Sequence, residues 1–245
     1  SSRPKLPLPP GVHWGESSGS YQLRDAKVEL AWIPPGAFVR EGGTKVVIGR
    51  GFFLGTCEVT QEQYARFCDE TGHPFPRAFK LPGKDLSDGL PVSNVSFTDS
   101  VAYCRWARVR LASDSEWEYA AVGRDSRPWP WGSKNVMNHN GGSRSDGFPG
   151  LSPVKSYLQG RSPFGVFDLA GNVSEWTADP FVPEEVRSQT ERISTRRANG
   201  ERARVIHGDN YGTAKLEDRL LAYRQSREEN FRSVLLGFRI AISAR

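Results

Sequence analysis

The chain has 245 residues, of which 37% are hydrophobic and 25% charged, and its formal net charge is +5. This hydrophobic fraction is sufficient for a packed core, which argues against a disordered chain. The 25 Gly, 17 Pro and single Met exclude a helical bundle and favour a loop-rich fold. The apolar runs are far shorter than the ~20 residues that span a bilayer, so we expect no transmembrane segment.

The N-terminal part of the chain favours extended structure. Residues 1–20 are rich in Pro, Ser and Gly and predict an arm with little internal structure. Residues 28–33 alternate in part between apolar and polar and end at a Pro-Pro-Gly turn, and residues 45–48 resume a strand pattern after two glycines. Together these two runs predict a β-hairpin.

Three capping boxes predict three short helices. In such a box an N-cap hydroxyl and the side chain three residues later satisfy each other's free backbone N–H groups. The pairs are Thr60 with Gln63, Ser96 with Asp99, and Ser113 with Glu116. Apolar residues at helical spacing follow each box, so each helix should present one apolar stripe to a shared core. We expect the first and third helices to end near Gly72 and Gly123.

The chain after Gly123 is irregular. Nearly fifty residues pass without a helical period, which in a compact domain is typical of functional or metal-ordered loops. Residues 184–203 are polar and Arg-rich and predict a mobile surface loop, whereas residues 220–223 and 237–242 predict two closing strands. We see no repeat of fixed period, so we predict one α+β domain over residues 21–245, preceded by the arm of residues 1–20.

Five motifs resemble those of a known family. They are Pro91-Val-Ser-Asn-Val-Ser-Phe97, Ala102-Tyr-Cys-Arg-Trp106, Arg110-Leu-Ala-Ser-Asp-Ser-Glu-Trp-Glu-Tyr-Ala-Ala121, Gly171-Asn-Val-Ser-Glu-Trp176 and Gly237-Phe-Arg239. Their order is similar to that of the sulfatase-modifying-factor family, which includes formylglycine-generating enzyme. The resemblance runs from about Trp32 to Ile242 and implies a C-type-lectin-like fold, with short helices around small antiparallel sheets.

The resemblance does not extend to the catalytic cysteines. Formylglycine-generating enzyme needs a pair of cysteines before the terminal Gly-Phe-Arg, because thiolates bind copper(I) and exchange with the substrate cysteine. The matching positions here fall near Tyr211 and Leu216, and no cysteine stands between Arg204 and Gly237. We therefore expect no oxidase activity and no catalytic residues.

The resemblance also implies two structural calcium sites. The first would use Asp168, the carbonyls of Gly171 and Val173, and Glu175, a set of oxygen ligands that suits a hard cation. Alternatively, Asp168 forms an Asx-turn and Glu175 pairs with an arginine. The second site would use Asn138, the carbonyl of His139, Asp146 and the carbonyl of Phe148.

These inferences favour a calcium-stabilised, non-enzymatic module that binds another envelope protein, such as a lipoprotein or the sensor domain of a kinase. Relatives of this kind act as exported regulators in bacterial envelope signalling, including a type VI secretion kinase pathway. The start at Ser1 without Met fits a periplasmic or otherwise exported protein, or a trimmed chain. The expected partner face consists of His207, Asp209, Asn210, Tyr211, Arg219, Arg224 and Arg227.

Several alternatives remain open at this point. One is a family enzyme with altered, metal-dependent oxidase chemistry, although no metal-ligand spacing is visible among the four histidines. Another is a carbohydrate-binding, lectin-like module. Glutamates interrupt the arginines of residues 187–204, which argues against nucleic acid as a partner. Cys57 and Cys68 could form a disulfide or stay free in the core.

Overall fold

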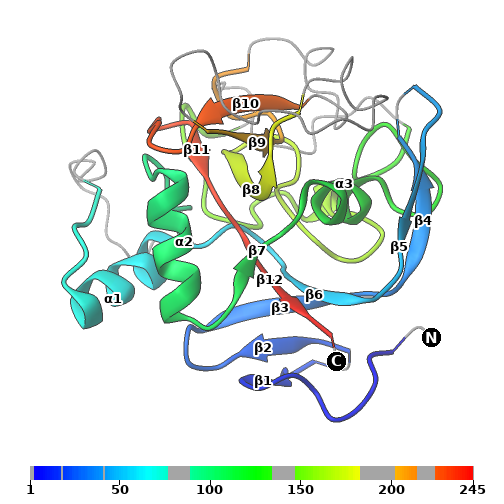
Figure 1. The fold of residues 1–245 in the computed structure, drawn as a ribbon, viewed down its shortest axis with the longest axis horizontal. Coiled ribbons are helices and arrows are strands. Elements are labelled where there is room, and N and C mark those ends of the chain that lie inside the picture. Colours follow the sequence, from blue (N-terminus) through cyan, green and yellow to red (C-terminus); the bar gives the residue numbers. More distant parts are fainter. Residues whose placement is uncertain are drawn as a thin grey trace.

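The computed structural model of the chain describes residues 3–17, 19–40, 42–76, 89–133, 147–182, 202–213 and 224–244. It confirms the predicted α+β class and its arrangement of short helices around small sheets (Figure 1). Among these residues, no helix is long and apolar enough to cross a membrane. The predicted loop of residues 184–203, except at its last two residues, and the predicted strand of residues 220–223 lie outside the described residues.

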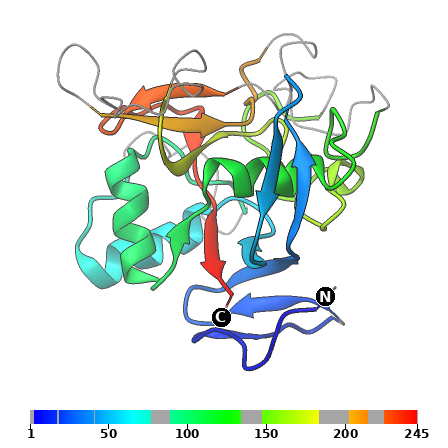
Figure 2. The same cartoon turned by 45° about the vertical axis from the view of Figure 1, so that its right-hand side comes forward.

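A six-stranded sheet forms the base of the fold (Figures 1 and 2). Its strands, in spatial order, are β1 Val12–Trp14, β2 Tyr21–Leu23, β3 Val28–Ile33, β6 Phe52–Gly55, β12 Ile240–Ser243 and β7 Arg110–Leu111. The prediction that the arm of residues 1–20 has little internal structure is therefore wrong at β1, which pairs antiparallel with β2.

The predicted hairpin is also wrong in its pairing. Strand β3 pairs with β2 and β6, whereas β5 (Lys45–Ile48) pairs with β4 (Gly36–Val39). The two prolines after β3 end that strand, and the chain starts a new one at Gly36. The β4–β5 hairpin rises beside α3 toward the second sheet (Figure 1).

The second sheet has the order β10 (Gln225–Glu228), β9 (Ala203–His207), β8 (Ser174–Pro180) and β11 (Leu236–Gly237). Strand β11 runs parallel to β8, and β12 belongs to the first sheet. The single strand predicted over residues 237–242 is thus divided between two sheets at Phe238 and Arg239. Both of these side chains are buried, so Arg239 lies in the interior where the chain passes from one sheet to the other.

The three predicted helices are confirmed, each with its complete capping box. They are α1 (Gln61–Thr71), α2 (Phe97–Trp106) and α3 (Asp114–Val122). Gly72 ends α1 in the left-handed conformation (φ 72°), and Gly123 follows α3 with φ 70°. In the irregular segment after α3, the described residues include one short 3₁₀ helix, Leu158–Gly160.

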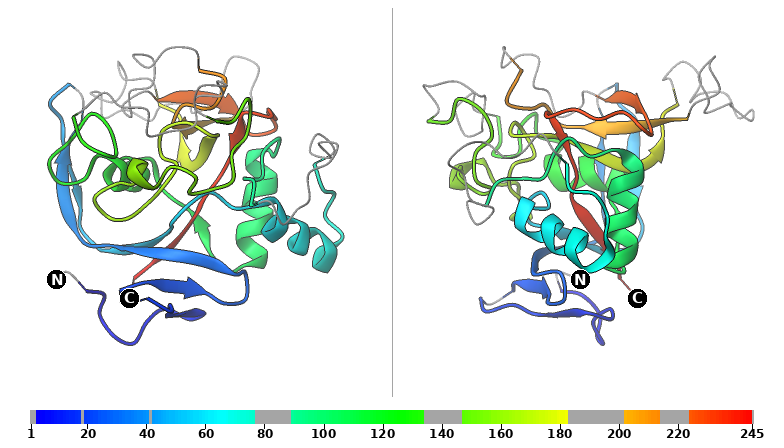
Figure 3. Two further views of the ribbon diagram at one scale, coloured as in Figure 1. Left: turned by 180° about the vertical axis from the view of Figure 1, so that it is seen from behind. Right: turned by 90° about the vertical axis from the view of Figure 1, so that its left-hand side faces the viewer.

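The core lies on both faces of the six-stranded sheet. Neighbouring residues of its strands belong to different clusters, as the alternation of a pleated strand requires: Leu30 and Ala31 on β3, for example. One face packs with α1 and α2, and the other with α3, as Figure 3 shows from behind. This layering places α3 between the six-stranded sheet and strand β9.

Candidate functional site

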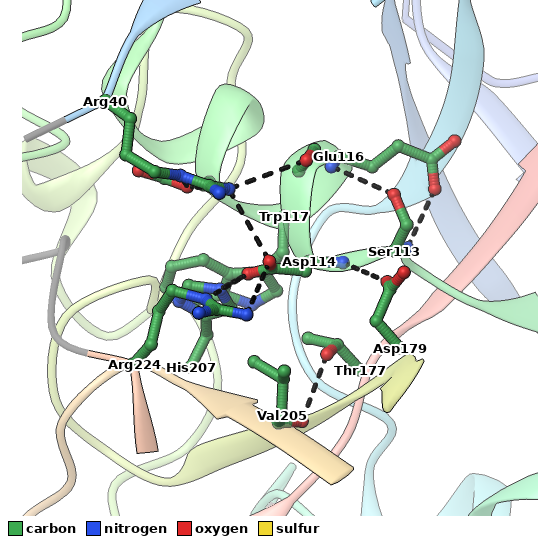
Figure 4. Close-up of polar contacts among 12 residues, drawn as sticks. Arg40, Ser113, Asp114, Glu116, Trp117, Thr177, Asp179, Val205, His207 and Arg224 are labelled. Atoms are coloured by element: carbon green, nitrogen blue, oxygen red, sulfur yellow. Dashed lines mark hydrogen bonds and ion pairs between the residues drawn. The ribbon is translucent and has the colours of Figure 1, made fainter. Parts of the chain in front are cut away.

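A buried polar cluster surrounds the N-terminus of α3 (Figure 4). Ser113 caps the helix, and the backbone N–H of Asp114 donates to Oδ2 of Asp179 on β8 at 2.6 Å. The carboxylate of Asp114 faces His207, whose Nε2 lies within hydrogen-bond distance of its Oδ1. Nε of Arg224 donates to the same oxygen at 3.0 Å, and Nη2 of Arg224 lies 2.8 Å from Oδ2.

A second arginine closes the cluster from the β4–β5 hairpin. Nε of Arg40 donates to Oε2 of Glu118 at 2.6 Å, and its Nη2 lies 3.6 Å from Oδ2 of Asp114. Since both carboxylates are almost fully buried, this ion pairing compensates for their lost hydration. We refer to Arg40, Asp114, Glu118, His207 and Arg224 as the Asp114 cluster.

The charges of the cluster hold Asp114 ionised. Burial by itself would raise the pKa of Asp114, but the hydrogen bonds and charges of His207 and Arg224 outweigh it and hold the pKa far below its usual range. The carboxylate is thus the acceptor, and Nε2 of His207 is the donor in this contact. Nδ1 of His207 is buried, and no described residue bonds to it.

The Asp114 cluster also has the donor types of a metal site. Among the described residues, Asp114, Glu118 and His207 form the one set of three His, Cys, Asp or Glu side chains with ligand atoms within 4.8 Å of one another. However, Arg40 and Arg224 contact the same carboxylate oxygens and already neutralise them. A divalent cation would have to displace two guanidinium groups, so the geometry favours a charge-compensated network over a metal centre.

A second buried cluster centres on Glu175, in strand β8. Nε and Nη2 of Arg239 donate to its two oxygens, each at 2.6 Å, and Nε1 of Trp117 donates to Oε2 at 2.9 Å. Both members of the Arg239–Glu175 pair are about 1% exposed. The alternative considered for Glu175, pairing with an arginine, is therefore what the structure shows.

The other residues predicted for the first calcium site lie next to this cluster. Asp168 has φ 56° and is 9% exposed, and its Oδ2 accepts the backbone N–H of Lys155 at 2.6 Å. Gly171 and Val173 are buried in the same turn, which leads into β8. Because the oxygens of Glu175 already accept three hydrogen bonds, this carboxylate is less available to a cation than the sequence suggests.

Glu58 is a third buried carboxyl group near this turn, and sequence reasoning missed it. It is 1% exposed, and neither of its oxygens accepts a hydrogen bond from a side chain or backbone group in the part of the chain that the structure describes. Burial raises its pKa well above the usual value, and the negative charge of Asp168 adds to the effect. A cation site requires oxygen atoms that are not already occupied by protein donors, and the oxygens of Glu58 meet this requirement among the described residues.

The second predicted calcium site cannot be assembled from the described residues. Asn138, His139 and Asp146 lie outside them. Phe148 is half-buried, and its ring lies 6.3 Å from that of Tyr157.

The residues expected to form the partner face divide into two groups. His207 and Asp209 are buried, so the expectation that they contact a partner is corrected. Asp209 instead accepts the backbone N–H of Gly171, which ties the loop after β9 to the predicted calcium turn. Asn210, Tyr211, Arg224 and Arg227 are half-buried, and Arg219 lies outside the described residues.

Sequence reasoning also missed Arg40, Trp117 and Glu118 as members of the polar clusters. Trp117 and Glu118 stand in a motif whose apolar residues indicate a helix and give no sign of a charged partner. Arg40 is 78 residues from Glu118 in the chain, and only the pairing of β4 with β5 brings it to α3. The cysteines, in contrast, follow one of the two alternatives, since all three are free.

Comparisons with known proteins agree with this fold. The sulfatase-modifying factor enzyme 1-like domain matches residues 18–244. The inactive C-alpha-formylglycine-generating enzyme 2 of Mus musculus is 33% identical over 192 residues, which cover 70% of this chain and 57% of that protein. The formylglycine-generating enzyme of Mycobacterium tuberculosis is 39% identical over 128 residues, 45% of this chain and 40% of that protein.

A comparison with solved structures shows that the fold is shared over most of the chain. PvdO from Pseudomonas aeruginosa has a TM-score of 0.75 at 23% identity and covers 94% of this chain and 100% of that one. The chain spans about half the length of the curated relatives it matches. By their names, these relatives include both active and inactive proteins. The chain belongs to the sulfatase-modifying factor enzyme 1-like family.

Proposed function

We propose that the chain is a non-catalytic member of its family that acts by binding another protein. The observation that carries this proposal is the position of its thiols. The loop after β9 has Tyr211 where the first active cysteine would fall, and the chain's three cysteines are at 57, 68 and 104. None of these stands in strands β8 to β11 or in the loop after β9.

The thiols that the chain does have are unsuited to copper or disulfide chemistry. Burial, and then the charge of Glu58, raises the pKa of Cys57 to about 12. Burial, and then Asp69, raises that of Cys68 to about 11, and burial also raises the pKa of Cys104. Since the thiolate is the nucleophile and the metal ligand, such thiols stay protonated and unreactive at neutral pH.

The altered-enzyme alternative would need the Asp114 cluster to hold a metal. Its donors are close enough, but the two arginines and the burial of His207 argue against an open coordination position. Elemental analysis of the purified protein distinguishes the two functions. We expect less than a tenth of an equivalent of iron or copper, and one equivalent of either would favour the enzyme.

The proposed binding surface is the part of the expected face that solvent reaches, extended by the turn between β10 and β11. Arg227 lies over the ring of Phe231, 5.4 Å from its centroid, and Phe231 and Val234 are 37% and 41% exposed. Gly212, next to Tyr211, lies close to Leu235 of this turn, since a Cβ at Gly212 would stand 3.3 Å from the Leu235 side chain. Exposed aromatic and arginine side chains of this kind are typical of interface anchors.

The partner that fits this chemistry is a protein presenting apolar and acidic side chains. A capture experiment with an envelope extract of the source cell tests it, using wild type and the double variant Tyr211→Ala, Arg227→Ala. We expect wild type to retain a partner in near-stoichiometric yield and the variant to lose it. Leu158→Ala, a change at an exposed apolar residue in the 3₁₀ helix, is the control. No partner on wild type, or equal capture by the variant, would contradict the proposal.

The proposal has two further parts that do not depend on the binding face: the role in envelope signalling and the structural calcium ion. The role in envelope signalling, in the periplasm, stays a prediction from the resemblance. Calcium is proposed as a structural ion at the turn of residues 168–175, where it would link loops that bury little apolar surface. The oxygens of Glu58 are buried beside this turn and accept no hydrogen bond from the described residues, which supports a cation there.

A further inference from the structure

A hollow of about 410 Å³ is lined by the N-terminal segment, by Trp32 on β3 and by the turn between β5 and β6. Ala244 also belongs to its wall, so the hollow lies near both chain ends, at the end of the fold opposite strand β10 (Figures 1 and 2). The proposed binding surface is at β10 and the turn that follows it. The proposed function therefore gives this space, which we call the Trp32 hollow, no role.

The charged side chains of the Trp32 hollow have one sign. Arg3 and Lys5 come from the N-terminal segment and Arg50 from the turn between β5 and β6, and all three residues are exposed. None of the described residues in its wall is acidic. Several cations around one concave space raise the local concentration of anions. The lining therefore favours an anionic ligand, and a ligand group with two negative charges over a group with one.

A neighbouring hollow of about 800 Å³ has a different charge pattern. It shares Arg3 and Trp32 with the Trp32 hollow, but Glu16 and Glu29 belong to its wall. Carboxylates repel an anion, so the smaller space is the better anion site. Its volume is within the range of about 300–1,000 Å³ that is typical of small-molecule sites.

Trp32 adds a fixed apolar wall and a hydrogen-bond donor. Its ring lies against that of Phe53, with centroids 5.1 Å apart, and so close to Gly51 that a Cβ there would stand 2.2 Å from Cη2 of the indole. Its Nε1 is buried and has no acceptor among the described residues. A buried donor without an acceptor is unfavourable, and an oxygen atom of a ligand would remove this cost.

We propose that the Trp32 hollow binds a small phosphate ester. A phosphate monoester carries about two negative charges at neutral pH, which suits the three cations of the lining. The guanidinium groups of Arg3 and Arg50 can each donate paired N–H groups to phosphate oxygens. The organic part of the ester lies against the indole of Trp32 and the ring of Pro35, which lines the same space. The inference does not rest on the proposed protein-binding function.

Isothermal titration with three sugars that differ at one carbon tests this assignment: glucose 6-phosphate, glucuronate and glucose. We expect saturable binding of glucose 6-phosphate with a Kd below about 1 mM, binding of glucuronate that is weaker by about tenfold or more, and no binding of glucose. Arg50→Gln removes one guanidinium group from an exposed turn and should weaken the binding of glucose 6-phosphate by about tenfold or more. Arg105→Gln is the matched control, since Arg105 is exposed on α2.

The remaining outcomes decide against the proposal. No saturable binding of glucose 6-phosphate, or equal affinity of wild type and Arg50→Gln, would overturn it. Equal affinity for glucuronate would contradict the preference for a doubly charged group, and equal affinity for inorganic phosphate would show that the organic part is not recognised. Sedimentation with phosphatidylglycerol vesicles, without binding of glucose 6-phosphate, would assign the cations to a membrane surface instead. Both variants should keep the Tm of wild type within about 2 °C, so that lost binding is not lost folding.

Discussion

The imidazole of His207 stacks on the indole of Trp117, with ring centroids 4.8 Å apart and the ring planes 10° from parallel. The same indole donates its N–H to Glu175. Trp117 therefore joins the two buried polar clusters, one around Asp114 and one around Glu175. In this chain, the region where the family's active surface is expected is a packed and charge-compensated interior.

Replacement of Trp117 by Phe tests this link. The variant removes the N–H that Glu175 accepts and leaves the stack on His207 in large part intact. We expect the free energy of unfolding to fall by about 1.5–3 kcal/mol, because the lost bond is to a buried charged group. Urea denaturation measures the change. Trp14→Phe is the matched control, since Trp14 is 52% exposed, and it should change stability by less than about 0.5 kcal/mol.

Asp114 should make stability depend on pH. Its pKa in the folded protein is depressed, so it stabilises the fold above its unfolded pKa of about 3.9, and this contribution is lost as the pH falls. Because the folded pKa lies so low, the loss continues through the acid range below about pH 5. Asp114→Asn should therefore be destabilised most at pH 7, and the difference from wild type should shrink toward pH 3.

Urea denaturation at pH 7, 5, 4 and 3 checks this dependence. Asp69→Asn, at an exposed position of α1, is the control and should stay within about 0.5 kcal/mol of wild type. A difference between wild type and Asp114→Asn that is constant from pH 7 to pH 3 would contradict the ion pairing of Asp114.

Arg239 should be among the residues most sensitive to substitution. Arg239→Met leaves Glu175 as a buried, unpaired carboxylate, and breaking such a pair costs about 3–5 kcal/mol. Chemical denaturation measures the loss. Arg66→Met breaks a pair of similar chemistry on the exposed face of α1 and should have little effect. Equal effects of the two substitutions would show that the Arg239–Glu175 pair contributes no more than a surface pair.

The thiols should be free and slow to react. Labelling with a maleimide at neutral pH should modify three thiols per chain in guanidinium and proceed far more slowly in the native protein, because burial raises the pKa of each thiol. Mass spectrometry counts the labels. A native chain in which one thiol reacts as fast as a small-molecule thiol would overturn the statement that none is activated.

Local patterns in the sequence predicted local structure well. Capping boxes involve residues three apart, so Thr60, Ser96 and Ser113 each marked a helix start that the structure has. Strand pairing was less predictable. Strand β3 pairs with β2 and β6 because of the arrangement of the whole sheet, and it does not pair with β5, the strand that the sequence analysis paired with it. The division of residues 237–242 between two sheets was unpredictable for the same reason. The strands that pair with this segment, β8 for β11 and β6 for β12, are both far from it in the chain.

The candidate sites show the same limit. The resemblance singled out Asp168, Glu175 and His207 as site residues, but it could not give the side chains that they contact. Arg40 lies 74 residues from Asp114, and Glu58 lies 110 residues from Asp168. Contacts over such separations depend on how the elements pack. The residues next to a charged side chain in the sequence therefore do not reveal that packing will bury it.

The most direct test of a non-catalytic function is incubation of the protein with a sulfatase-derived peptide, copper and oxygen, followed by mass spectrometry of the peptide. We expect the peptide cysteine to be recovered unchanged, while an active formylglycine-generating enzyme run in parallel yields the aldehyde. Aldehyde formed by this chain, at a rate that depends on its concentration, would show that the protein is catalytic.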